Sequence, residues 1–72
     1  ETPVTVKGST WYLLVEPQTK TVSVRAQGKP VQARLLRTGN RLECEYAGGV
    51  VRVDLPAAER TELVDVVALR FA

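Results

Sequence analysis

The chain has 72 residues, 44% hydrophobic and 25% charged, which suits one small domain with a marginal core. Ten Lys and Arg against eight Asp and Glu give a net charge of +2, spread along the chain. That balance is too weak for the basic face of a nucleic-acid binder, and no apolar run is long enough for a membrane helix, so we expect neither nucleic acid nor membrane as a partner.

Cysteine and histidine usage limits the chemistry of the chain. With one cysteine, Cys44, and no histidine, the sequence lacks the usual ligand set of a transition metal and the pair needed for an internal disulfide. Its acidic residues do not follow the spacing of a calcium loop. We therefore expect no metal site and no cofactor, and we interpret Cys44 as a buried structural thiol.

The first blocks of the chain predict β-strands. β-branched and other apolar residues recur in short runs separated by turn residues, without helical spacing. A short strand or lead-in is predicted over residues 4–6, and a strong strand over residues 11–16, which Pro17 ends because proline lacks the N–H donor of the ladder. Apolar side chains occupy both faces of the strong strand, with Trp11, Leu13 and Val15 on one and Tyr12 and Leu14 on the other.

Residues 21–37 predict two strands joined by a turn at residues 27–30. The first, over residues 21–25, alternates cleanly and turns Val22 and Val24 inward. The second spans residues 31–37 and continues into a tight connection at residues 38–40 that suits a hairpin. Its inward positions are Val31, Ala33 and Leu35, and Leu36 adds an apolar residue to the opposite face.

Residues 42–55 predict an antiparallel hairpin. Leu42, Cys44 and Tyr46 share one face of a strand over residues 41–46, and residues 50–55 form its partner after a glycine turn. The polar connection over residues 57–61 is long enough for one turn of helix, and residues 63–71 predict a last strand that is largely apolar on both faces.

Together these blocks predict an all-β fold: a small antiparallel β-sandwich of about six to seven strands in a single domain over residues 1–72. The expected core residues are Val22, Val24, Leu35, Leu42, Cys44, Val51, Val53, Val67 and Leu69.

Several segments carry a family resemblance. Leu35-Leu36, the Gly39-Asn40 turn, Leu42 and the apolar segments 49–56 and 66–71 resemble the C-terminal β-sandwich of bacterial α-L-fucosidases, which are retaining glycoside hydrolases. The resemblance implies an accessory domain that follows a catalytic β/α barrel, in a secreted or periplasmic parent enzyme. It fits a chain that begins at Glu1 and contains no methionine, which favours a segment excised from a longer polypeptide.

The acidic residues do not predict catalysis by this chain alone. Glu43 and Glu45 share one strand face at about 7 Å, close to the spacing of glycosidase carboxylate pairs. Arg41 and Arg52 accompany them, so solvated charges in cross-strand pairs are the favoured interpretation, and we expect no catalytic residue here.

The aromatic residues bear on an alternative function, a free-standing module that binds carbohydrate or protein. Trp11 and Tyr12 point to opposite strand faces, so they cannot form one sugar-stacking platform, and Trp11 is expected in core or interdomain packing. The aromatics are dispersed over different strands, which favours the accessory-domain hypothesis.

Segments that are apolar on both faces predict a docking surface, because an isolated sandwich keeps its outer faces polar. We expect the parent's catalytic domain to cover that surface, and the isolated chain to self-associate through it. Carbohydrate would be contacted through the parent. The docking residues expected are Leu14, Leu36, Val66 and Ala68, with Tyr12 at the rim.

Overall fold

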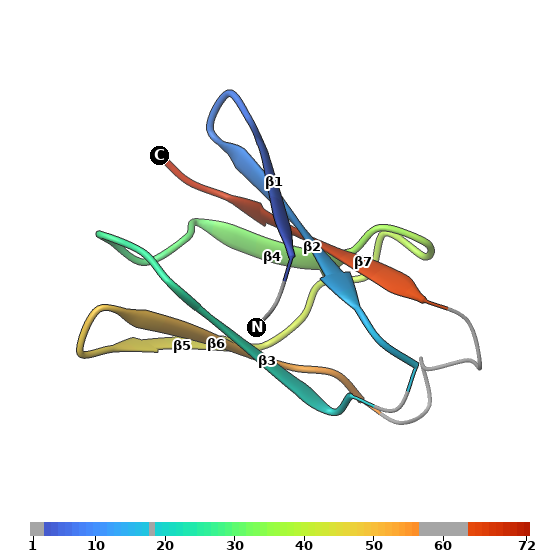
Figure 1. The fold of residues 1–72 in the computed structure, drawn as a ribbon. Coiled ribbons are helices and arrows are strands. Elements are labelled where there is room, and N and C mark those ends of the chain that lie inside the picture. Colours follow the sequence, from blue (N-terminus) through green and yellow to red (C-terminus); the bar gives the residue numbers. More distant parts are fainter. Residues whose placement is uncertain (1–2, 18, 57–63) are drawn as a thin grey trace.

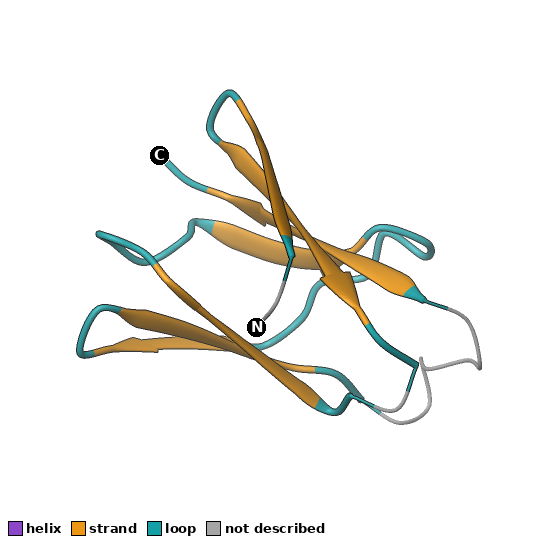
Figure 2. Ribbon diagram, in the orientation of Figure 1, coloured by secondary structure: helices purple, strands orange, loops and turns teal. Residues whose placement is uncertain are grey.

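The computed structural model describes residues 3–17, 19–56 and 64–72, and these form seven β-strands without a helix (Figure 2). The strands build two antiparallel sheets, which confirms the predicted small all-β fold. The connection expected over residues 57–61 and the start of the strand expected over residues 63–71 lie outside the described residues. The strands are β1 (Val4–Lys7), β2 (Thr10–Val15), β3 (Thr21–Arg25), β4 (Gln32–Leu35), β5 (Cys44–Ala47), β6 (Val50–Asp54) and β7 (Asp65–Arg70).

The two sheets lie one above the other (Figure 1). The four-stranded sheet has the order β1-β2-β7-β4, and the three-stranded sheet has the order β3-β6-β5. The chain changes sheets after β2, β3, β4 and β6, so only β1–β2 and β5–β6 are hairpins of consecutive strands. Long-range pairing therefore holds β7 between β2 and β4 at the centre of the larger sheet.

The hairpin predicted over residues 42–55 is present as β5–β6. Cys44 pairs with Val53 and Ala47 pairs with Val50 in the register. The turn consists of Gly48 and Gly49, whose φ angles of 58° and 79° lie in the left-handed region that favours glycine.

Side chains from both sheets form one core. All the predicted core residues except Val24 and Cys44 are buried; these two are half-buried and pack against the core. The prediction was wrong for this pair because β3 and β5 are the two edges of the three-stranded sheet, where cover is incomplete. The buried apolar residues are Leu13, Val15, Val22, Ala33, Leu35, Leu42, Val51, Val53, Leu55, Val67, Ala68 and Leu69.

The strand predicted over residues 31–37 is shorter in the structure. Val31, expected inward, precedes β4 and is 57% exposed, whereas the neighbouring Pro30 is buried. β4 ends at Leu35, whose carbonyl oxygen accepts a hydrogen bond from the Gly39 N–H at 2.7 Å. This bond starts the turn that replaces the last two residues of the expected strand.

The strand predicted over residues 41–46 is divided between the sheets. Arg41 forms an isolated bridge with Arg34, and the Leu42 N–H donates to the Ala33 carbonyl oxygen at 2.8 Å, so the chain first turns back along β4. It then crosses to the other sheet, where β5 begins at Cys44. Leu42 is buried in the core cluster, as predicted, but alternation did not reveal that it lies at the crossing between the sheets.

Candidate functional site

The residues expected to dock lie together on the outer face of the four-stranded sheet. Leu14 pairs with Val66 in the β2–β7 register, and the Leu36 N–H donates to the Val66 carbonyl oxygen at 2.9 Å. These three residues, here called the apolar row, therefore cross the sheet side by side. Tyr12 pairs with Ala68 in the next row of the same face.

Exposure differs within this surface. Leu14 and Leu36 are each 46% exposed, which is unusual for leucines placed on either side of one central strand. Val66 and Tyr12 are half-buried. Ala68 is only 3% exposed, because its short side chain lies between the longer side chains of Tyr12 and Arg34 in the register. The accessible apolar atoms of the surface come chiefly from the two leucines.

The rest of the same face is polar and basic. Ala68 pairs with Arg34, which in turn bridges to Arg41, and Arg70 pairs with Thr10 and Gln32 in the last row. The face therefore grades from the apolar row at one end to arginines at the other. A partner that matches it would present apolar side chains beside acidic ones.

A partly buried ion pair lies at the edge of the apolar row. The Arg37 Nε donates to Asp65 Oδ1 at 2.9 Å, and the Asp65 side chain is 1% exposed against 38% for Arg37. Asp65 opens β7 directly before Val66, and Arg37 directly follows Leu36. The alternation of apolar and polar residues did not predict this pair. The signal that could have found it was an aspartate at the start of a strand that is otherwise apolar on both faces.

Glu43 and Glu45 are both exposed, as expected of solvated charges. Glu45 pairs with Arg52 in the β5–β6 register, and Glu45 Oε1 lies 3.9 Å from Arg52 Nη2. The Arg52 Nε lies 3.8 Å from Asp54 Oδ1 in turn. The interpretation of Glu45 as part of a cross-strand charge pair is therefore confirmed, and such exposed pairs contribute little to stability.

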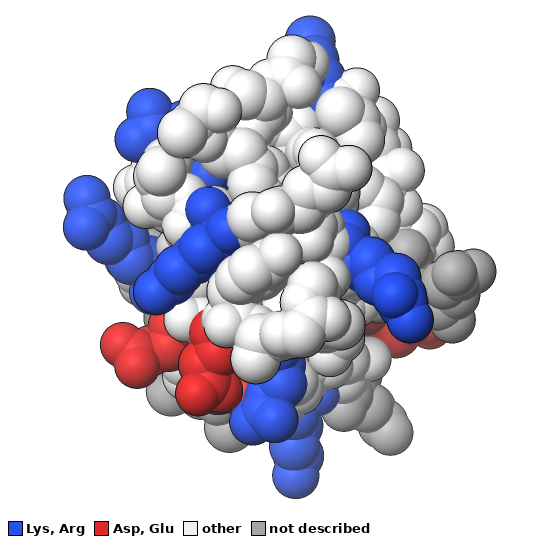
Figure 3. Space-filling model, turned by 90° about the vertical axis from the view of Figure 1, so that its left-hand side faces the viewer, with Lys and Arg blue, Asp and Glu red and all other residues white. Residues whose placement is uncertain are grey.

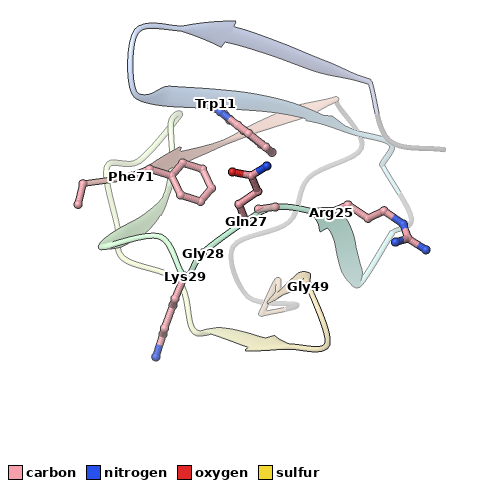
Figure 4. Close-up of a pocket in the computed structure, with 9 residues that line it drawn as sticks. Trp11, Arg25, Gln27, Gly28, Lys29, Gly49 and Phe71 are labelled. Atoms are coloured by element: carbon pink, nitrogen blue, oxygen red, sulfur yellow. The ribbon is translucent and has the colours of Figure 1, made fainter.

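The β5–β6 turn and the segment after β7 lie at the same end of the sandwich (Figure 1). Residues from both help to line a cleft at this end. The volume of the cleft is about 810 Å³. In Figure 4, Trp11 and Phe71 lie on one side of the cleft, and Gln27, from the loop after β3, lies next to both. The Trp11 and Phe71 ring centroids lie 4.8 Å apart with an interplanar angle of 51°. The lining residues are Trp11, Arg25, Ala26, Gln27, Gly28, Lys29, Gly49, Phe71 and Ala72.

This cleft corrects one part of the sequence analysis. Trp11 does pack against the core, as expected, but it also meets Phe71, which was treated as a dispersed aromatic of another strand. The two meet because Trp11 pairs with Leu69 in the β2–β7 register and the Phe71 N–H donates to the Ser9 carbonyl oxygen at 2.8 Å. The antiparallel pairing of β2 with β7 therefore brings these two aromatic residues together, and their positions in the sequence do not reveal this contact.

The described residues contain no group of three or more Cys, Asp or Glu side chains arranged to hold a metal ion. Among the same residues, no helix is long and apolar enough to span a membrane. The sequence matches no protein-family model, and comparisons with curated proteins and with solved structures find no match either. The candidate sites are therefore judged on their geometry.

Proposed function

We propose that the chain is a non-catalytic accessory β-sandwich of a glycoside hydrolase similar to α-L-fucosidase, and that the outer face of its four-stranded sheet packs against the catalytic domain of the same polypeptide. The observation that carries the proposal is the apolar row: Leu14, Val66 and Leu36 lie side by side on a face that solvent would otherwise wet. The kind of parent rests on the family resemblance alone.

The energetics favour a covalently linked domain as the partner. Burying about 300 Å² of apolar surface is worth roughly 7 kcal/mol before association costs, using about 25 cal/mol per Å². A second molecule must meet those association costs in full, whereas a domain linked in the same chain acts at an effective concentration in the millimolar range. A patch of this size is small for a stable dimer of free chains, and it would form one part of the larger interface that linked domains bury.

The surrounding groups support a fixed docking geometry. The Arg37–Asp65 pair ties the turn after β4 to the start of β7, so Leu36 and Val66 are held at the same height on the face. The basic end of the face, with Arg34, Arg41 and Arg70, would orient an acidic border of the partner.

Thiol labelling of the intact polypeptide that contains this chain tests the proposal. In a Cys44→Ser background, Leu14→Cys is expected to react with a maleimide at least about tenfold more slowly in the intact polypeptide than in the isolated chain, because a covered thiol reacts only when the interface opens. The matched control is Ser23→Cys on the outer face of the three-stranded sheet, which should react equally in both.

Equal labelling of Leu14→Cys in the two contexts would remove the docking role. A reading frame that encodes no second folded domain would remove the accessory role altogether and favour the alternative, a free-standing module that binds carbohydrate or protein.

A further inference from the structure

The cleft at the end of the sandwich combines an aromatic wall with one polar side chain. Trp11 and Phe71 are half-buried, so each ring keeps accessible surface. In Figure 4 the Gln27 side chain points toward both rings, whereas Arg25 and Lys29 extend away from them. The cleft volume of about 810 Å³ lies within the usual range for small-molecule sites.

Both walls of the cleft are held in place by hydrogen bonds. On the loop side, the Ala26 N–H donates to the Gly49 carbonyl oxygen at 3.0 Å, and the Ala26 carbonyl oxygen accepts from the Tyr46 hydroxyl at 3.0 Å. Gln27 therefore directly follows a residue whose backbone N–H and carbonyl oxygen are both hydrogen-bonded. On the aromatic side, Trp11 lies in a strand paired on both edges, with Val6 and Leu69 as its partners. A preorganised site loses less conformational entropy when it binds.

The charges of the lining select a neutral ligand. None of the lining residues is acidic, and the two cations do not point toward the rings. Figure 3 shows this end of the molecule with uncharged side chains at the centre, Lys and Arg side chains around them, and Asp and Glu side chains toward the lower border. The site thus offers an apolar wall for stacking and one amide that both donates and accepts.

Those features match the chemistry of a sugar ring. A neutral pyranose has an apolar C–H face that packs on an aromatic ring, and a rim of hydroxyl groups that both donate and accept hydrogen bonds, as the Gln27 amide does. Trp11 and Phe71 are tilted, so one ring can stack beneath the sugar while the other contacts its edge.

We infer that the cleft formed by Trp11, Phe71 and Gln27 binds a neutral pyranose ring, with a dissociation constant on the order of 1–10 mM as expected of a single open subsite. This site lies at the end of the sandwich, and Trp11 faces the core side of its sheet. The inference is therefore independent of the proposed docking face.

Titration of the chain followed by ¹H–¹⁵N correlation spectra tests the inference. D-Glucose, D-galactose and L-fucose are added separately to about 100 mM, well above the expected dissociation constant. At least one of them should shift the amides of Gly28 and Gly49 and the indole N–H of Trp11 saturably. The chain has one tryptophan, so its fluorescence provides a second readout at the site itself. D-Sorbitol, a polyol without a ring, should produce no saturable change.

Three variants separate the site from the fold. Gln27→Ala changes an exposed side chain and should weaken binding about fivefold, the value of one lost hydrogen bond. Trp11→Leu should weaken binding at least about tenfold, as measured from the amide shifts. The dispersion of the variant's spectrum reports whether the fold persists. Lys29→Gln is the matched control within the lining, and it should leave binding unchanged because its side chain points away from the rings.

The inference is overturned if none of the three sugars gives a saturable shift, or if sorbitol acts as glucose does. It is equally overturned if Gln27→Ala binds like the parent chain, or if Lys29→Gln abolishes binding, since the latter would place the sugar on a side chain that points away from the rings. Binding of benzyl alcohol without any sugar would show a merely apolar cleft and would also remove it.

Discussion

The outer faces of the two sheets differ sharply although both belong to one small sandwich. On the three-stranded sheet, the row that crosses the middle of the outer face is polar, whereas the outer face of the four-stranded sheet carries an apolar row at one end. The polar row is Ser23, Arg52 and Glu45, and the apolar row is Leu14, Val66 and Leu36.

The polar outer face of the three-stranded sheet suits contact with water. The apolar row on the four-stranded sheet suits contact with a partner. The inner faces of both sheets are equally apolar, so the core does not distinguish them. Only the outer faces carry the distinction, because an outer face in water gains nothing from leucine and is normally polar. The functional hypothesis for this chain therefore rests on the outer face of the four-stranded sheet, whose apolar row is not part of the core between the sheets.

The largest expected effect concerns the ion pairs of the two sheets. Arg37→Ala leaves the Asp65 carboxylate buried without its arginine and should lower the free energy of unfolding by about 2–3 kcal/mol, somewhat less than for a fully buried pair because Arg37 is partly exposed. The control Arg52→Ala removes exposed pairs of the three-stranded sheet and should cost about 0.5 kcal/mol or less. Urea denaturation measures both, and equal costs would contradict the structural role assigned to Arg37.

The second effect concerns the apolar row. Leu14→Ser combined with Leu36→Ser should weaken any self-association of the isolated chain at least about tenfold, since apolar contact area is lost. The fold should persist, because both leucines are about half exposed in the single chain. Sedimentation velocity against concentration measures the change. A parent chain that remains monomeric at millimolar concentration would show that the row does not drive self-association.

The converse experiment moves the apolar row to the other sheet. Ser23→Leu, Arg52→Val and Glu45→Leu copy the apolar row onto the outer face of the three-stranded sheet. If the row alone causes association, this variant should associate several-fold more tightly than the parent chain, because it carries two such patches. Sedimentation without any increase would indicate that the leucines of the four-stranded sheet act only together with their basic neighbours.

The smallest expected effect concerns the carboxylates of the three-stranded sheet. Glu45→Gln should change the free energy of unfolding by about 0.5 kcal/mol or less, because its pair with Arg52 is exposed. The isolated chain should also fail to hydrolyse an aryl α-L-fucoside, with or without this substitution. Turnover that Glu43→Gln or Glu45→Gln abolishes would overturn the assignment of these residues to a solvated surface.

Local sequence was sufficient for the fold class and for most of the inward side chains, although not for the bounds of every strand. Val22 and Val53 each lie between two polar residues, and this period-two alternation translates directly into a buried face. It was also sufficient for the β5–β6 hairpin, because the Gly48-Gly49 pair supplies the positive φ angles of its turn. The residues of the apolar row were found in the same way, from strands with apolar side chains on both faces.

What the sequence determined by itself was therefore the alternation of each strand, and with it the fold class and the residues of the outer apolar face. The tertiary structure alone decided which strands pair, and so which residues from distant segments meet: Arg37 with Asp65, Trp11 with Phe71, and Leu42 at the crossing between sheets. The physical reason is that alternation is a local property of the backbone, whereas pairing of β2 and β4 with β7 joins segments separated by much of the chain, and no spacing rule encodes that choice.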